Sequence, residues 1–514
     1  MDKQLELKLF QQSMKKILAF IIISLAISAC NNAPKLKELK KLKENEAFVE
    51  AMIENQSSFY YTDISQYPNK RKSLPIGIFD SGIGGLTVLD AIINFDKFSN
   101  ANLSVGADSI KDFVNERFIY LADQANMPYS NYAEVGKENL LAEHVLKDVQ
   151  FLMGNKYYSS NSSENYETDK LAVKSIVIAC NTATAYGKAK VDELMDLTGL
   201  NIKVIGVIDA GCKGAIDALK DETDGIIAIF ATPATVGANA YPKTLQKILK
   251  KNGYTANIKT YQQGGKGLHE SIDEDLQFIN RALKKPSLDY IGPSLQNDKY
   301  PLKKELLAFY NFNTTNNNLL FNNKDLNSSD TIQINAVENY VRYHIVSLLE
   351  TIREKDANMP LKSIILGCTH YPYVVDTINT VLNELRQFKI NGEQPYKNIL
   401  ANKVEIIDPA QNTAKELFEY LKESKMLNDE NEQLLKTDQF YISKANLNNS
   451  KVEIENGKLT YNYKYIVRQP NDIQEYVKVV PFNHKSISTE VLLNIKQALP
   501  ETYKKIETYL NSDQ

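Results

Sequence analysis

The chain has 514 residues, of which 43% are apolar and 24% charged, the composition of a globular protein rather than a disordered one. At roughly 150 residues per domain, the length predicts two to four domains with sizeable cores. The net charge of −3 and the pI near 6.1 give no electrostatic reason to expect a nucleic-acid partner.

An apolar run, ILAFIIISLAIS, follows Lys15 and Lys16 near the N-terminus. A bilayer-spanning helix needs about 20 residues, so this run of about a dozen has the length of a signal-peptide core. The small residues before Cys30 resemble the bacterial lipobox, in which the cysteine is acylated and becomes the mature N-terminus. We therefore expect a lipoprotein signal peptide over residues 1–29 and a lipid anchor at Cys30. The protein then faces the periplasm or the cell exterior, and is cytoplasmic if the signal is not used.

Residues 30–72 contain NNAPKLKELKKLKENEAF and then a polar, tyrosine-rich stretch. The Leu and Lys spacing allows a short amphipathic helix, but the density of charge favours a solvated segment. We interpret residues 30–72 as a tether.

From Leu74 onward, short apolar runs end at small or polar residues and are followed by helical periodicity. Continuous apolar strands that alternate with helices predict parallel sheets covered on both faces, so the fold class is α/β. The predicted strands are residues 75–80, 117–123, 175–180, 203–209, 225–232, 363–368 and 404–409.

Polar residues stand where these strands finish, and ligands of open α/β sheets bind at the carboxyl ends of strands. For Asp209 or Asp408 taken alone, a turn or helix cap is the favoured explanation, because polar residues naturally cap strands and begin turns or helices. For the two cysteines this explanation is weaker, because a buried structural cysteine usually lies within an apolar run. The strand-end residues are Asp80, Asp123, Cys180, Asp209, Thr232, Cys368 and Asp408.

The glycines of DSGIGGLTVLDAI, residues 80–92, allow a close backbone approach to a ligand. Their spacing matches neither a dinucleotide fingerprint nor a P-loop with its lysine. We expect backbone N–H groups and Ser81 to approach a small carboxylate here, with Asp80 held at the strand end.

The two strand-end cysteines lie in similar contexts, SIVIACNT and SIILGCTH. The four cysteines and five histidines lack the close pairs of a metal site. A Cys-His hydrolase leaves the second cysteine unexplained, and a structural disulfide leaves Asn-Thr and Thr-His unexplained. Two thiols on opposite faces of a carbon acid explain both copies, because one takes a proton and the other returns one. That reaction is racemisation.

Six segments together resemble the cofactor-independent glutamate racemases of the aspartate/glutamate racemase superfamily, in the family's order. The resemblance covers most of residues 74–440, and Asp80-Ser81 favours glutamate over aspartate. It implies an isomerase that needs no cofactor and no metal, and that supplies D-glutamate for cell-wall peptidoglycan. The segments are IGIFDSGIGGLTVL (76–89), DQANMPYSNY (123–132), ACNTATA (179–185), GVIDAG (206–211), ATPATV (231–236) and LGCTHYP (366–372).

By this resemblance, Cys180 and Cys368 are the paired acid and base. Asp80 assists the first thiol, and His370 and Glu270 assist the second. A free thiol has a pKa of about 8.5, and neighbouring donors or positive charge lower it. The residues implied to bind the carboxylates and ammonium of the substrate are Asp80, Ser81, Pro128, Tyr129, Ser130, Asn181, Thr182 and Thr369.

The chain departs from the family pattern in several places. The segment YQQGGKGLHES (261–271) replaces a Cys-Pro stretch, so His269 is the alternative to Glu270 there. Residues 99–116, 154–172 and 286–360 are interpreted as insertions, the last with an exposed Asn-rich loop at 311–330. Residues 445–480, with KVEIENGKLTYNYKYIV, predict extra strands and a hairpin turn at Asn456-Gly457.

The family architecture implies two similar α/β lobes with the active site in the cleft between them. We place the first lobe at 73–208 and 400–514, the latter with C-terminal additions, and the second at 209–399.

The leading hypothesis is an amino-acid racemase acting on glutamate. The alternative is a lipid-anchored amino-acid-binding or surface interaction protein on a weakened racemase scaffold. The expected partners are an amino-acid substrate, the membrane through Cys30, and a second copy of the chain in a homodimer.

Overall fold

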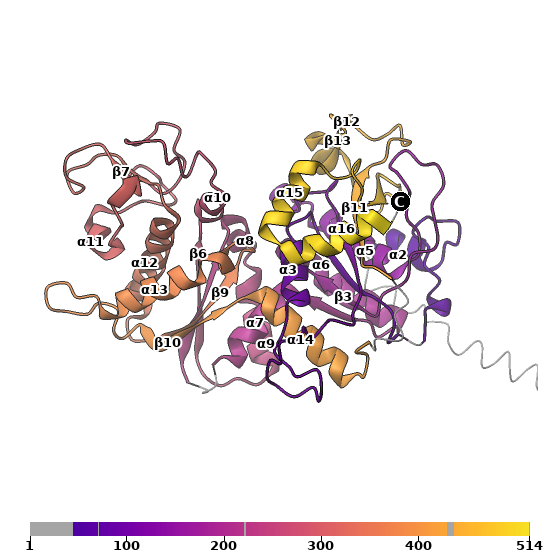
Figure 1. Cartoon of the computed structure of the whole chain (residues 1–514), viewed down its shortest axis with the longest axis horizontal. Helices are drawn as coiled ribbons and strands as arrows, with labels where there is room; N and C mark the ends of the chain where they lie inside the picture. Colours follow the sequence, from indigo (N-terminus) through magenta and orange to yellow (C-terminus); the bar gives the residue numbers. More distant parts are fainter. Residues whose placement is uncertain (1–44, 70, 220–222, 429–435, 513–514) are drawn as a thin grey trace, which may run out of the picture.

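The computed structural model describes residues 45–69, 71–219, 223–428 and 436–512. Two lobes lie side by side, and each is built on its own sheet (Figure 1). The predicted α/β class, with two lobes and parallel-sheet cores, is confirmed.

The first lobe holds a six-stranded sheet in the order β14-β11-β2-β1-β3-β4. All neighbours are parallel except β14, which is antiparallel to β11. The strands read as continuous apolar runs because helices cover both faces. Their bounds are β1 Ile76–Asp80, β2 Phe118–Ala122, β3 Ser175–Ile178, β4 Lys203–Gly206, β11 Gln439–Ala445 and β14 Val477–Pro481.

The second lobe holds four parallel strands in the order β10-β9-β5-β6. We placed the return to the first lobe at residue 400, but β10 pairs with β9 in the second sheet, so this boundary is wrong by one strand. An apolar run shows that a strand is buried and does not show which sheet buries it. The bounds are β5 Gly225–Ala231, β6 Ile258–Gly264, β9 Leu361–Gly367 and β10 Leu400–Ile407.

Helices cover the first sheet on both faces. Helices α2, α5 and α6 share one buried cluster with it, and α3, α14, α15 and α16 share the other. The C-terminal helices α15 and α16, yellow in Figure 1, therefore belong to the first lobe. The bounds are α2 Glu46–Ile53, α3 Leu86–Ile93, α4 Ser130–Glu134, α5 Glu138–Met153, α6 Asn181–Thr198, α14 Pro409–Glu423, α15 Thr489–Ala498 and α16 Pro500–Ser512.

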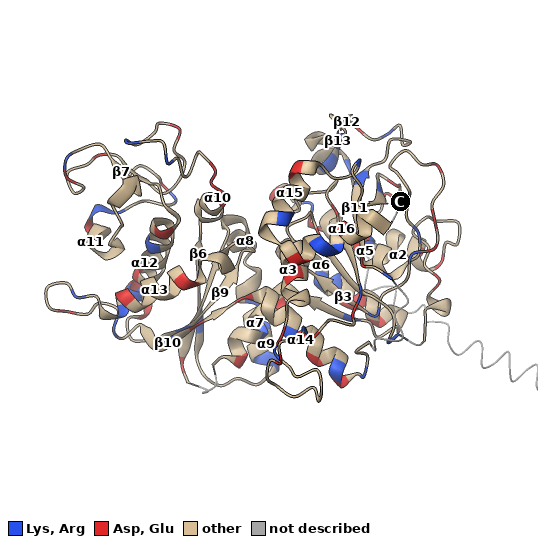
Figure 2. Ribbon diagram, viewed as in Figure 1, with Lys and Arg blue, Asp and Glu red and all other residues tan. Residues whose placement is uncertain are grey.

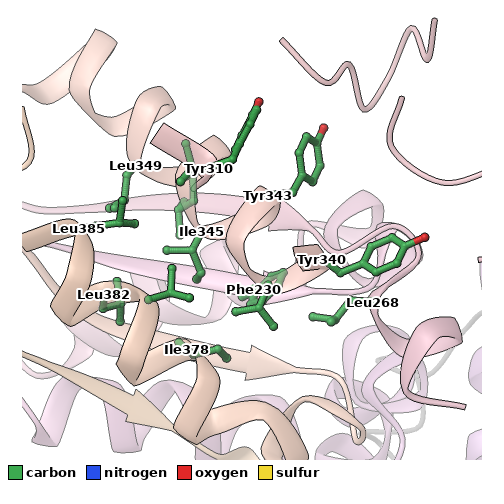
Figure 3. Close-up of a cluster of buried hydrophobic side chains, with 14 of the residues drawn as sticks. Phe230, Leu268, Tyr310, Tyr340, Tyr343, Ile345, Leu349, Ile378, Leu382 and Leu385 are labelled. Carbon is green, nitrogen blue, oxygen red and sulfur yellow. The ribbon is translucent and has the colours of Figure 1, made fainter. Parts of the chain in front are cut away.

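The second sheet packs against α10 to α13 on one face and against α7 and α9 on the other. Figure 3 shows the first of these clusters, where Phe230 and Leu268 lie near Tyr340 of α12 and Ile378 of α13. The helix bounds are α7 Val207–Asp217, α8 Pro233–Ala238, α9 Ala240–Lys251, α10 Leu268–Ile272, α11 Leu307–Tyr310, α12 Val337–Asp356 and α13 Val375–Gln387.

The segment 286–360, interpreted as an insertion, is not all peripheral. Its last part is α12, whose residues Tyr340, Val341 and Ile345 are fully buried in the core of the second lobe. The Asn-rich part before it is largely exposed and carries a short hairpin, β7 Leu319–Phe321 with β8 Ile332–Ile334.

The predicted tether over 30–72 is wrong in its second half. Helix α2 buries Phe48, Val49 and Met52 completely, and Tyr67 donates a hydrogen bond to the Val173 carbonyl at 2.7 Å. The prediction failed because the charged residues of this segment outnumber the three apolar residues that α2 buries completely on one face. The predicted signal peptide at 1–29, Cys30 and the rest of the tether up to residue 44 lie outside the described residues.

The C-terminal addition only partly follows the expected strands. The hairpin at Asn456-Gly457 is confirmed, because β12 Ile454–Glu455 pairs antiparallel with β13 Lys458–Leu459 and both turn residues have positive φ. YNYKYIV is not a strand, since Tyr463–Val467 form a π-helical turn. Alternate tyrosines mimic a strand period, but Tyr463 and Tyr465 are buried from this turn instead.

Asp209 was also expected at a strand end and instead lies in the first turn of α7, because β4 finishes at Gly206. Charges of both signs are interspersed over the described elements (Figure 2). No helix of the described residues is long and apolar enough to cross a membrane.

Candidate active site

Cys180 occupies the N-cap of α6, two residues after the end of β3. Its sulfur accepts a hydrogen bond from the Ala183 N–H at 3.4 Å. The thiol also lies 3.6 Å from Ser81 Oγ and is hydrogen-bonded to the Asp80 carboxyl, which ends the neighbouring strand β1. The sheet thus brings Cys180 next to Asp80 and Ser81, which lie about 100 positions earlier in the sequence.

The glycine loop after β1 wraps around Asp80. The N–H groups of Gly82 and Gly85 donate to Asp80 Oδ2 at 3.3 and 2.8 Å. A Cβ on Gly85 would lie 2.5 Å from the Asp80 Cβ and 2.9 Å from that of Ala179, so only glycine permits this approach. We expected these N–H groups to meet a ligand, but here they hold the strand-end carboxylate.

Burial governs the protonation of this pair. It raises the pKa of Cys180 to about 12, and the negative charge of Asp80 adds to the rise while the Ala183 N–H opposes it. Burial also raises the pKa of Asp80, against the Gly85 hydrogen bond. With the thiol protonated, Asp80 is the neighbouring group that can accept its proton.

Cys368 follows β9 in the second sheet, in the place that Cys180 has in the first. Its sulfur lies 3.9 Å from His370 Nδ1, and the other ring nitrogen lies 3.3 Å from Asp273 Oδ1. A carboxylate only accepts hydrogen bonds, so it favours the tautomer with the proton on Nε2 and a lone pair on Nδ1. Burial lowers the pKa of His370, which favours the neutral ring that this geometry requires.

Glu270 pairs with a different histidine. His269 Nδ1 lies 3.2 Å from Glu270 Oε2, and the rings of His269 and His370 are 5.2 Å apart. The two candidates for this position therefore bind each other, and Asp273, which sequence reasoning missed, takes the place beside His370. The only sign of Asp273 in the sequence is that it is an acidic residue three positions after Glu270.

Cys368 is buried like its counterpart. Burial raises its pKa to about 12, and the N–H groups of His370 and Tyr371 oppose the rise. Among the described residues, Cys180, Cys212 and Cys368 are all free thiols. Two protonated thiols, each beside a proton acceptor, therefore stand at equivalent strand ends of the two sheets.

A cavity of about 160 Å³ lies between the lobes next to these thiols. Such a volume is about ten times the roughly 10–15 Å³ that one water molecule needs on the same measure, so a small ligand fits. Cys368 and Thr369 line it from the second lobe, and Ala179 and Asn181, the neighbours of Cys180, line it from the first. The segments around the two cysteines, residues 179–181 and 368–369, thus line the same cavity.

One hydrogen bond crosses between the lobes beside this cavity. The hydroxyl of Tyr241 in α9 donates to Asn181 Oδ1 at 3.0 Å. Thr182 is half-buried in the same turn of α6. Asn181 is thus both a cavity residue and an interlobe contact.

The segment 127–130 lies against the glycine loop, since a Cβ on Gly82 would be 2.7 Å from Met127 Sδ. Pro128 is exposed and Ser130 half-buried. The Tyr129 hydroxyl, in contrast, lies inside the first lobe, 2.5 Å from Asp123 Oδ2 and 2.7 Å from Asp148 Oδ2. Tyr129 can therefore reach a ligand only through its backbone.

Two other strand-end residues act as helix caps. The side chain of Thr232 accepts from the Thr235 N–H, and that of Asp408 accepts from the Ala410 N–H. The simpler explanation from the sequence thus holds for both. Over the described part of the chain, no group of three or more His, Cys, Asp and Glu side chains could hold a metal ion.

No protein-family model matches the chain. A glutamate racemase from Chlorobaculum tepidum is 34% identical over 167 residues, which are 32% of this chain and 45% of that protein. A glutamate racemase from Sulfurihydrogenibium sp. is 25% identical over 357 residues, 70% of this chain and 89% of that protein. The crystal structure of a glutamate racemase isoform from Bacillus anthracis covers 72% of this chain and 88% of its own, with 23% identity and a TM-score of 0.40.

At more than 30% identity, the chain spans about half the length of the curated relatives it matches. The match to the Sulfurihydrogenibium protein extends further at lower identity. In sequence, the chain is therefore similar to glutamate racemases.

Proposed function

We propose that this protein is a cofactor-independent racemase that interconverts L-glutamate and D-glutamate. The observation that carries the proposal is the pair of free, buried cysteines at equivalent strand ends of two sheets, beside one interlobe cavity. Binding alone does not require two such thiols. The sequence similarity to curated glutamate racemases supports the same activity.

The proton balance follows from the two neighbourhoods. On one face, the Cys180 proton passes to Asp80, and the resulting thiolate removes the Cα proton of the substrate. On the other face, the Cys368 thiol donates its proton to the carbanion. After turnover, a proton from solvent, relayed through Nδ1 of His370, reprotonates the Cys368 thiolate, and Asp80 releases its proton to solvent. The reverse direction exchanges these roles, so His370 Nδ1 accepts the proton of Cys368 before Cα is deprotonated.

Substrate recognition is assigned to the polar residues of the cleft. Asn181 and Thr369 line the cavity, and their amide and hydroxyl donors suit carboxylate oxygens. Thr182, Ser81 and the backbone of residues 128–130 complete the proposed set. With both carboxylates held, only the Cα proton changes place.

Glutamate is proposed rather than aspartate because of the Asp80-Ser81 pair. One methylene is worth only about 1–3 kcal/mol in discrimination, so kcat/KM should favour glutamate by roughly 10- to 200-fold. Equal or higher efficiency with aspartate reverses the substrate assignment and leaves the reaction type intact.

We also propose the location and assembly that the sequence implies. A lipid on Cys30 would hold the enzyme at a membrane, where D-glutamate could serve cell-wall peptidoglycan, and two copies would form a homodimer. Mass spectrometry of the mature N-terminus tests the anchor, and an unmodified N-terminus upstream of Cys30 rejects it. Sedimentation of the purified protein tests the dimer, and a monomer at micromolar concentration rejects it.

Chiral chromatography tests the activity itself. Purified protein is incubated separately with L-glutamate and D-glutamate, without added cofactor or metal. The proposal predicts that both reactions reach the same equal mixture of enantiomers. If both enantiomers bind but neither is converted, the protein is the amino-acid-binding alternative.

A further inference from the structure

Tyr241 contacts the neighbours of both thiols. It is 0% exposed, and its hydroxyl donates to Oδ1 of Asn181, the residue after Cys180. Its ring packs on Gly367, the residue before Cys368, where a Cβ would lie 3.2 Å from Tyr241 Cε2. The side chain of Tyr241, from the second lobe, therefore contacts the residue after Cys180 and the residue before Cys368.

The position and protonation of this phenol are well defined. Its backbone carbonyl accepts a hydrogen bond from Cys212 Sγ of α7 at 3.6 Å, and Leu245 and Ile208 pack in the same cluster. Burial, followed by the charges of nearby acidic groups, holds the pKa of Tyr241 far above its usual value. The hydroxyl thus stays protonated and remains a donor.

A donor at this position fixes the orientation of the Asn181 amide. An amide group has an acceptor oxygen and a donor nitrogen, and the hydroxyl of Tyr241 takes the oxygen. The NH₂ group is then left for the cavity, which Asn181 lines together with Thr369. A flipped amide would instead present its oxygen to the ligand and repel a carboxylate.

We propose that Tyr241 is a positioning residue that holds the N–H donors of Asn181 toward the cleft and so selects a carboxylate there. The inference rests on the proposed glutamate site and adds how that site is oriented. Since the bond joins α9 to α6, it also ties the orientation of Asn181 to the relative position of the lobes. A substrate carboxylate is bound well only while this contact is made.

Tyr241→Phe keeps the ring on Gly367 and removes only the hydroxyl. Loss of one hydrogen bond should raise KM for both enantiomers, and the calorimetric Kd for D-glutamate, about 3- to 10-fold. kcat should change less than twofold, because the thiols stay in place. Tyr343→Phe is the matched control, since it also removes a buried hydroxyl, one that donates to the Pro301 carbonyl away from the cleft. It should leave KM unchanged.

A double variant separates positioning from a general loss of stability. If Tyr241 acts through Asn181, then Tyr241→Phe should have no further effect on KM in an Asn181→Ala background. Asn181→Asp keeps an acceptor for Tyr241 but replaces the donors with a negative charge. It should fold like the wild type by thermal unfolding and lose glutamate binding.

A wild-type KM in Tyr241→Phe, additive effects in the double variant, or intact glutamate binding in Asn181→Asp each overturn the inference and leave the racemase proposal standing. A wild-type protein that neither binds nor converts glutamate rejects the proposed function and the inference together. Comparison with the wild type therefore distinguishes the two failures.

Discussion

The ring of His370 stands between a carboxylate and a thiol: Nε2 lies 3.3 Å from Asp273 Oδ1, and Nδ1 lies 3.9 Å from Cys368 Sγ. The carboxylate favours the tautomer with the lone pair on Nδ1, which lies between the Thr369 hydroxyl at 3.3 Å and the thiol. Asp273 is half-exposed, so the contact contributes orientation more than stability. It gives the second thiol the proton acceptor that Asp80 provides for the first.

Asp273→Asn should lower kcat about 10- to 100-fold, at or below the lower end of what a positioned acid-base group contributes. The reason is that an amide can donate to Nε2 and so favours the wrong tautomer. KM should change little, because Asp273 does not line the cavity. Asp275→Asn is the control, since that side chain accepts from the Gln277 N–H instead. Steady-state kinetics in both directions decide it, and a wild-type kcat in Asp273→Asn refutes the relay.

Each thiol should be essential for racemisation. Cys180→Ala or Cys368→Ala leaves one face of the substrate without a proton partner, so turnover should disappear while calorimetric binding of glutamate remains. Cys212→Ala is the matched control, because Cys212 is also free and buried but lies outside the cavity lining. It should retain racemisation. Full racemisation by either single-thiol variant is incompatible with the two-thiol mechanism.

Asp80→Asn should change the pH profile and not only the rate. In the wild type, Asp80 receives the Cys180 proton internally, so kcat/KM should be nearly flat from pH 7 to 8.5 and fall in acid as Asp80, whose pKa burial raises, becomes protonated. Without this acceptor, Cys180 must lose its proton to solvent. Burial raises its pKa to about 12, so the thiolate fraction rises about tenfold per pH unit below that value.

The pH–rate profile of kcat/KM measures this change. Asp80→Asn should show a logarithmic slope near one between pH 6 and 8.5. A variant profile parallel to that of the wild type would mean that Asp80 does not take the proton.

Lys170 should make stability depend on pH. Burial lowers its pKa from 10.5 to about 7, and its ammonium donates hydrogen bonds to the neutral Leu152 and Leu171 carbonyls at 3.2 and 2.9 Å. Between pH 7 and 10.5 the unfolded state binds more protons than the folded state, so this group makes the free energy of unfolding rise with pH. The penalty is complete below pH 7.

Lys170→Met keeps the stem and removes the charge. It should therefore stabilise the protein by a few kcal/mol at pH 6, at most about 1.4 kcal/mol per unit of pKa shift, and the gain should shrink toward pH 10.5. Thermal or denaturant unfolding across this range measures it. A gain that is independent of pH, or a loss at pH 6, contradicts the assignment.

Local sequence patterns predicted most of the scaffold. The strands that lead to Asp80, Cys180 and Cys368 are predicted correctly, because an apolar run that stops at polar residues is a property of each strand by itself. The pairing of Cys180 with Asp80 and Ser81 follows from parallel strands that present their carboxyl ends at one edge.

Features set by distant contacts could not be predicted. Strand β10 joins the second sheet through pairing with β9, which no local pattern records. Tyr241 contacts Asn181 from 60 residues away, and Asp273 replaces Glu270 beside His370 through the local path of the chain after α10. In each case the function of the residue or strand depends on a contact with a distant or neighbouring segment, which its own local sequence does not encode.

The most direct test of the two-thiol mechanism is the fate of the Cα hydrogen in heavy water. The wild-type protein is incubated with protiated L-glutamate in D₂O, and the D-glutamate product is isolated and examined by mass spectrometry and proton NMR. Because one thiol removes the proton and the other delivers one from solvent, the first D-glutamate formed should carry deuterium at Cα, without cofactor, and neither Cys180→Ala nor Cys368→Ala should form it. D-glutamate that retains the original proton at Cα, or deuterated product from either single-thiol variant, would contradict the mechanism.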